Sequence, residues 1–190
     1  MTPPPNIFAI DPGCTETAWL EYEPAAARIV GFGKIPNPEM LRALGERQTG
    51  GAVMVIESVA CYGMAVGWEV FETVFWSGQF WHAWYGAKDR LYRKDVKLSI
   101  CKDSRANDTA IRRALMDRFG GDRSVKSQQC PTCKGTRLRG KAKTPCGCGD
   151  GWKIKPGPLV GITRDVWAAL GVACAYADGA RSRIKGVGAE

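Results

Sequence analysis

Residues 7–13, Ile-Phe-Ala-Ile-Asp-Pro-Gly, decide the fold predicted for this chain of 190 residues. An apolar run that stops at turn-forming residues is typical of a buried strand. Pro12 lacks a backbone donor and Gly13 tolerates positive φ, so the strand ends there. Asp11 then lies at an edge of the sheet, where it either binds a metal or caps the turn.

A second apolar run ends in the same way. Residues 53–56 are all apolar and lead directly into Glu57, which favours a central strand buried on both faces. If this strand and the first are parallel neighbours, Asp11 and Glu57 meet at one edge of the sheet. Paired carboxylates suit a hard cation such as Mg²⁺ or Mn²⁺; the alternative is that Glu57 only ends a strand.

The remaining pattern is that of an α/β protein. Residues 17–22 and 28–35 predict an antiparallel meander with the first strand. The other expected elements are helices over 68–85, 104–119 and about 164–177, with a fifth strand over 91–100. The helix over 68–85 carries more large aromatic residues than a core needs, which favours a dimer interface.

The last expected helix carries an acid that is a candidate for the same metal site as Asp11 and Glu57. Thr163 is expected to cap this helix, and Asp165 then lies in its first turn. If the helix packs on the sheet, Asp165 reaches the edge that holds Asp11 and Glu57. The alternative is an ordinary acid at a helix N-terminus.

Two close cysteine pairs predict a metal-binding knuckle. Cys130 and Cys133 are followed a dozen residues later by Cys146 and Cys148. Four thiolates at this spacing would bind a structural Zn²⁺ with tetrahedral geometry. The segment has few apolar residues, so it could hardly fold without a metal.

The net charge of +8 is concentrated around these cysteines. Residues 123–155 hold nine of the 27 Lys and Arg residues but one of the 19 acids, so the rest of the chain is neutral. A local basic segment favours a polyanionic partner, above all nucleic acid. The candidate DNA-binding residues are Arg137, Arg139, Lys141, Lys143 and, ahead of the last helix, Arg164.

The length and composition of the chain narrow the class of protein further. No apolar run approaches the ~18 residues of a membrane span, and residues 1–6 lack the pattern of a signal peptide. We therefore expect a cytoplasmic protein without a membrane partner. Its cysteines are then expected to be reduced or metal-bound.

The order of these elements resembles the RNase H-like fold, and the motifs resemble its RuvC-type Holliday junction resolvases, phage-encoded members in particular. The resemblance rests on Ile10-Asp11-Pro12-Gly13, on Val55-Ile56-Glu57, on residues 165–170 and on residues 105–112 after Lys97. It implies an α/β fold with a mixed five-stranded sheet flanked by helices. The resemblance does not cover residues 123–155, which are expected to be a small zinc-binding insertion with four cysteine ligands. Residues 1–122 and 156–190 would form the nuclease domain, and residues 123–155 the basic insertion.

The resemblance also implies an activity. Such enzymes are Mg²⁺-dependent endonucleases that bind four-way DNA junctions as homodimers and nick two strands symmetrically. Asp11 would bridge two ions, with Glu57 and Asp165 completing the site. The family usually has a second acid, or a His, three residues from the one on the last helix. Here Ile162 and Ala168 flank Asp165 at that spacing, and Asp108 is a candidate fourth ligand.

Three other functions compete with a resolvase. A related nuclease could act on flaps, replication forks or RNA–DNA hybrids, because junction preference depends on dimer geometry. A non-catalytic zinc-containing DNA-binding protein would explain the basic segment but not the acids. Asp11-x-Gly13-x-Thr15 also fits the phosphate loop of sugar kinase and actin-like ATPases, which need about twice this length.

Overall fold

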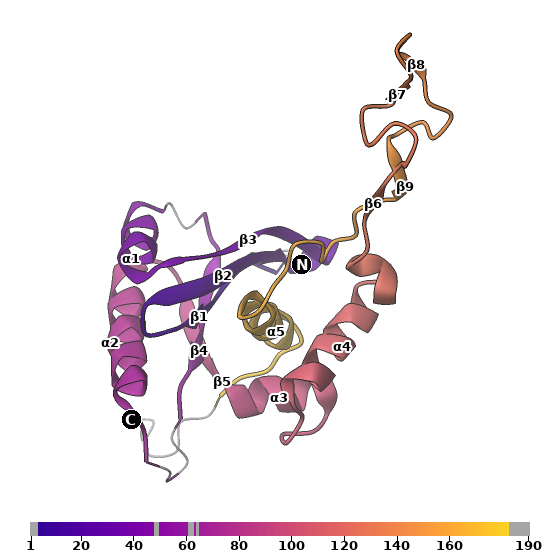
Figure 1. Cartoon of the computed structure of the whole chain (residues 1–190). Helices are drawn as coiled ribbons and strands as arrows, with labels where there is room; N and C mark the ends of the chain where they lie inside the picture. The colour runs from indigo at the N-terminus through magenta and orange to yellow at the C-terminus, as the bar shows by residue number, and fades with distance from the viewer. Residues whose placement is uncertain (1–3, 48–49, 61–62, 64, 183–190) are drawn as a thin grey trace. The chain divides into compact units, whose positions relative to one another are not determined.

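Five strands form one mixed sheet in the order β3-β2-β1-β4-β5 (Figure 1). β1 (Ile7–Pro12) pairs antiparallel with β2 (Glu16–Glu23), and β2 pairs antiparallel with β3 (Arg28–Pro36). β1 also pairs in parallel with β4 (Val53–Ser58), and β4 pairs in parallel with β5 (Lys88–Tyr92). The predicted α/β architecture with a mixed five-stranded sheet is therefore confirmed.

The structure is a computed structural model that describes all residues except 1–3, 48–49, 61–62, 64 and 183–190. The chain divides into two compact units. The first unit comprises Met1–Arg112 and Thr163–Glu190, and contains the sheet. The second comprises Arg113–Ile162, and contains the four clustered cysteines. No helix within the described part of the chain is long and apolar enough to cross a membrane.

Helices cover both faces of the sheet (Figure 1). On one face, α1 (Asn37–Glu46) and α2 (Trp68–Ala83) pack against alternate residues of β1 and β4, with Trp84 fully buried among them. On the other face lies α5 (Val166–Ala177), which contacts β1, β2 and β4. Because α5 is apolar on all sides, it is buried along almost its whole length.

One predicted element is wrong. Residues 91–100 are expected as a fifth strand, but the strand is β5 and ends at Tyr92. The next residues form the helix α3 (Arg93–Cys101), which packs against α5. The β-branched residues Val96 and Ile100 favour a strand by propensity, but they are four residues apart and share a helix face. Burial of Val96 in tertiary packing outweighs that weak propensity.

The helix α4 (Asp108–Arg118) begins in the first unit and leads into the second. After α4 and a 3-10 helix over Gly121–Ser124, the regular structure of the second unit consists of two short pairs of strands. β6 (Gln128–Gln129) pairs with β9 (Trp152–Ile154), and β7 (Leu138–Arg139) pairs with β8 (Thr144–Pro145).

The chain closes the second unit by passing directly over its own backbone at Gly157. A Cβ atom there would lie 2.3 Å from the carbonyl oxygen of Arg123 and 2.5 Å from Cα of Ser124. The following backbone is fixed by a 2.9 Å hydrogen bond from the Leu159 N–H to the Ser124 carbonyl oxygen. Only glycine allows this approach.

Candidate active site

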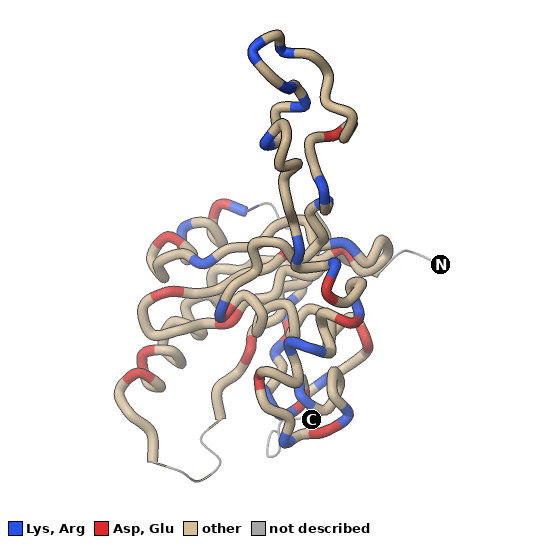
Figure 2. The backbone as a smooth tube through the Cα atoms, turned by 45° about the vertical axis from the view of Figure 1, so that its right-hand side comes forward, with Lys and Arg blue, Asp and Glu red and all other residues tan. Residues whose placement is uncertain are grey.

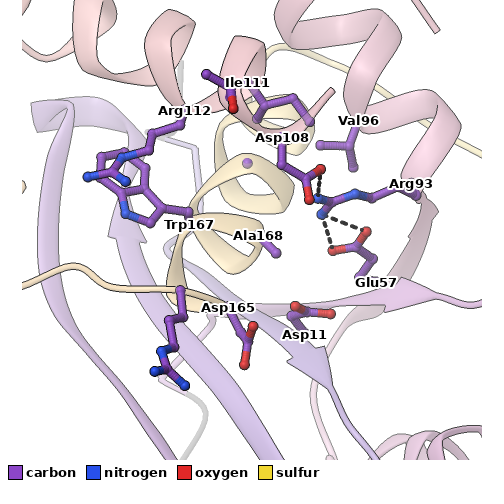
Figure 3. A pocket seen from close by; sticks show the side chains of 13 residues that line it. Asp11, Glu57, Arg93, Val96, Asp108, Ile111, Arg112, Asp165, Trp167 and Ala168 are labelled. Carbon is purple, nitrogen blue, oxygen red and sulfur yellow. Dashed lines mark hydrogen bonds and ion pairs between the residues drawn. The ribbon is translucent and has the colours of Figure 1, made fainter. Parts of the chain in front are cut away.

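The sheet brings Asp11 and Glu57 together as the sequence predicts. Ile10 pairs with Ile56 across the parallel strands β1 and β4, so the next residue of each strand lies at the same sheet edge. Asp165 immediately precedes α5. In Figure 3, Asp11 lies between Asp165 and Glu57.

All three carboxylates line one pocket of about 580 Å³ within the first unit. Asp108, the first residue of α4, is a fourth acid in its wall. The other lining residues combine three arginines with apolar and small residues from α3, α4 and α5: Arg93, Arg112, Arg164, Val96, Thr109, Ile111, Trp167, Ala168 and Gly171.

Arg93 bridges two of the four acids (Figure 3). Its Nη1 donates to both oxygens of Glu57, at 3.1 and 3.3 Å, and its Nη2 donates to Oδ1 of Asp108 at 2.6 Å. Glu57 is 7% exposed, and a buried carboxylate is costly without such a cation. Arg93 therefore compensates the negative charge of Glu57, which is buried at the edge of the sheet.

Asp165 is held by a different cation. Lys34 of β3 contacts Asp165 at 2.9 Å and Glu16 of β2 at 3.1 Å. Both hydrogen bonds raise the pKa of Lys34, which stays charged. The predicted capping role of Thr163 is wrong, because α5 begins at Val166 with Asp165 as its N-cap residue and has no side-chain capping bond.

Burial and the repulsion of neighbouring carboxylates raise the pKa values of Asp11 and Glu57. Burial, together with the charges of Glu57 and Asp165, raises the pKa of Asp11 to about 8, against the lowering effect of Arg93 and Lys34. Burial also raises the pKa of Glu57, opposed by Arg93. Carboxyl groups perturbed in this way are typical of functional sites.

The raised pKa of Asp11 predicts a pH-dependent stability. Folding lifts this pKa from 3.8 to about 8, so the folded state binds the proton more tightly and the free energy of unfolding falls as pH rises through that window. Without added Mg²⁺, Asp11→Asn should be more stable than wild type by up to about 5 kcal/mol at pH 8 and should show little gain at pH 4. Urea unfolding at both pH values measures this difference, and an equal gain at both would contradict it.

The acids fit a hard divalent ion by their chemistry, since carboxylate oxygens are the ligands that Mg²⁺ and Mn²⁺ prefer. Their oxygens do not gather as closely as the cysteine sulfurs do. Within the described residues, the four cysteines are the one group of three or more potential ligands that meets at metal-binding distance. Arg93 and Lys34 instead hold Glu57 and Asp165 to separate partners.

Four cysteines of the second unit are positioned to bind a metal ion. Their four sulfurs lie within 4.8 Å of one another, with Cys130 and Cys146 at 3.8 Å and Cys133 and Cys148 at 3.5 Å. Zinc–sulfur bonds of ~2.3 Å in a tetrahedron place the sulfurs about 3.8 Å apart, so the cluster fits Zn²⁺. Backbone N–H groups of Cys133 and Thr132 lower the pKa of Cys130 to about 6, which favours its thiolate form.

The predicted DNA-binding cations of this unit are all exposed. Arg137, Arg139, Lys141 and Lys143 lie on the β7–β8 hairpin and the turn that joins its strands. Figure 2 shows Lys and Arg along the segment that holds this hairpin, with little acid. The fifth candidate, Arg164, belongs to the other unit, where it is exposed and lines the pocket of acids.

Sequence reasoning missed three residues of the pocket region. Arg93 directly follows β5, so correct placement of that strand end would have suggested it. Lys34 gave no local signal, because its partner Asp165 is far away in the sequence. Trp167 carries a buried indole N–H without a hydrogen-bond partner within the described structure, and the Arg112 guanidinium lies 4.9 Å from its ring centre.

Comparison with known proteins supports the fold. Neither a protein-family model nor a curated protein matches the sequence. The structure is similar to that of Thermus thermophilus RuvC, with a TM-score of 0.53 and 11% sequence identity over 91% of this chain and 93% of that one. It is also similar to T. thermophilus RuvC in complex with a Holliday junction substrate, with a TM-score of 0.51 and 12% identity over 92% and 94% of the two chains. The chain therefore has a RuvC-like fold.

Proposed function

We propose that the chain is a structure-selective endodeoxyribonuclease that resolves four-way DNA junctions by metal-dependent hydrolysis of phosphodiester bonds. The observation that carries this proposal is the convergence of Asp11, Glu57 and Asp165, from β1, β4 and the start of α5, on one pocket. The RuvC-like fold supports it, because one similar structure was determined with a Holliday junction substrate.

The three acids share one role in this proposal, and Asp11 is the central one. Asp11, Glu57 and Asp165 would hold Mg²⁺ or Mn²⁺, and the ion would polarise the scissile phosphate and activate the attacking water. Asp11 is central because it lies between the other two and interacts with both charges. Arg164, which is exposed at the same pocket, would bind a phosphate of the DNA strand.

The second unit would bind the DNA backbone. Its hairpin offers four exposed cations, and a structural Zn²⁺ on the four cysteines would hold the hairpin in shape. Contacts of this kind go to phosphates and carry no sequence information. Affinity should consequently fall steeply as salt rises, through counterion release.

We propose that the enzyme is a homodimer that uses the exposed face of α2. Large apolar side chains gather on this helix and at its end, and they are exposed: Trp68, Phe71, Val74, Phe75, Trp81 and Tyr85. Exposed apolar patches of this kind mark protein interfaces, and symmetric nicking of a junction needs two active sites.

Removing two of these side chains should separate the dimer. Phe71→Ser combined with Phe75→Ser removes 67% and 55% exposed rings that lie four residues apart on one helix face. Sedimentation should then give the mass of one chain, 20.7 kDa, where wild type gives twice that mass. Glu72→Ser, an exposed neighbour on the same helix, is the control and should stay dimeric. A monomeric wild type would contradict this interface.

The substrate part of the proposal is tested by binding competition. Labelled four-way junction is bound by the protein in Ca²⁺, and unlabelled junction, linear duplex, flap and RNA–DNA hybrid are compared as competitors. The proposal predicts that the junction competes at least about tenfold better than duplex of the same length. Equal competition by all four would contradict structure selectivity, and preference for flap or hybrid would indicate a different nuclease of the same fold.

A further inference from the structure

The contacts of Arg93 place a cation directly on a proposed metal ligand. Both oxygens of Glu57 accept hydrogen bonds from the same nitrogen, Nη1. A divalent ion bound by Glu57 needs at least one of those oxygens. Guanidinium and metal therefore compete for Glu57, and the loss of one favours binding of the other.

Arg93 can release Glu57 without losing every partner. Its contact with Asp108 uses the other nitrogen, Nη2, and is the shorter of the two at 2.6 Å. The Asp108 side chain is 80% exposed, whereas that of Glu57 is 9% exposed. Rotation of the guanidinium toward Asp108 moves its charge toward solvent, which lowers the cost of leaving the buried carboxylate.

The backbone around this arginine is anchored, so only the side chain needs to move. Arg93 begins α3 directly after Tyr92, whose partner in the parallel β4–β5 ladder is Ser58, next to Glu57. Asp108 begins α4. Arg93 thus stands between two carboxylates on fixed elements, one buried at the sheet edge and one exposed.

We propose that Arg93 is a built-in counter-cation that a divalent metal must displace from Glu57, and that Asp108 is a positioning residue that draws Arg93 away rather than a metal ligand. The inference rests on the proposed function, because it assumes that Glu57 binds the catalytic metal. It makes the affinity for metal depend on two residues that do not touch the ion, with effects of opposite sign.

The test measures Mn²⁺ binding directly, by electron paramagnetic resonance of free Mn²⁺ with the zinc-loaded full chain at pH 8.5 under argon. At this pH, protons compete little with the metal. Arg93→Gln should bind Mn²⁺ about tenfold more tightly than wild type, and Arg93→Lys should lie between them. Asp108→Asn should bind about threefold to tenfold more weakly, because Arg93 then stays on Glu57.

The double variant separates positioning from ligation. If Asp108 acts only through Arg93, adding Asp108→Asn to Arg93→Gln changes the affinity no further. The matched control is Arg28→Gln, which removes an arginine that donates two hydrogen bonds to Glu23 on the same sheet. It should leave Mn²⁺ affinity unchanged. Circular dichroism checks that each variant is folded.

Each failure has a distinct meaning. Unchanged or weaker Mn²⁺ binding by folded Arg93→Gln overturns the role of Arg93. A further loss of affinity in the double variant overturns the role of Asp108 and makes it a ligand. If the wild type binds DNA but does not bind Mn²⁺, this result would instead overturn the metal site of the proposed function and this inference with it.

Discussion

Asp11→Asn should abolish junction cleavage while junction binding persists. The change removes one charge from the acid that lies between the other two, and with it several kcal/mol of the stabilisation that a divalent ion offers the transition state. We expect cleavage to fall by at least about a thousandfold. Junction binding should stay equal or become tighter, because a carboxylate that repels phosphate is gone.

The measurement pairs single-turnover cleavage in Mg²⁺ with a gel-shift titration of the same junction. Glu39→Gln, which neutralises an exposed acid in the first turn of α1, is the control and should cleave as wild type does. Cleavage by Asp11→Asn at a rate close to that of wild type would remove Asp11 from the active site. Loss of binding together with cleavage would point to a folding defect rather than to chemistry.

Replacing Cys130 and Cys133 with Ser should release zinc and unfold the part of the second unit that surrounds the cluster. This part has only short strand pairs and few buried apolar residues, so its shape depends on the metal. Zinc content should fall from about one ion per chain to near zero. Junction affinity at 150 mM salt should fall about tenfold or more as the basic hairpin loses its fixed form.

Elemental analysis and junction binding are measured on the same samples. Cys101→Ser changes a cysteine of α3, in the other unit, and should keep both zinc and affinity. If the double variant retains its full zinc content, the cysteine cluster is refuted as a zinc site. Loss of zinc with unchanged junction affinity would support the zinc site but would show that the hairpin does not contribute to DNA binding.

Patterns that depend on neighbouring residues predicted most of the fold. The apolar runs before Asp11 and Glu57 indicated buried central strands, and the parallel pairing of β1 with β4 confirms that reading. The cysteine spacing likewise predicted a cluster that the structure brings within 4.8 Å. The fifth strand was placed too late, because β-branched residues at 91–100 have a weak propensity that packing against α5 outweighs.

The cations that pair with the acids of the site, Arg93 and Lys34, were not predicted, for a different reason. Arg93 reaches Asp108, and Lys34 reaches Asp165, only because the sheet and its helices bring distant segments together. Such ion pairs have no local spacing that can be recognised in the sequence. Asp11 and Glu57 could be proposed from the sequence because two strand ends repeat a pattern, whereas the counter-cations follow from the three-dimensional arrangement.

The most direct test of the account is cleavage of a synthetic immobile four-way junction, with Mg²⁺ and with EDTA, beside a linear duplex, a flap and an RNA–DNA hybrid. The account predicts paired, symmetric nicks that require Mg²⁺ and are confined to the junction. Binding of the junction without cleavage in any divalent metal would contradict a nuclease and favour a non-catalytic DNA-binding protein. Cleavage of the flap or hybrid in place of the junction would retain the metal site and contradict the proposed substrate.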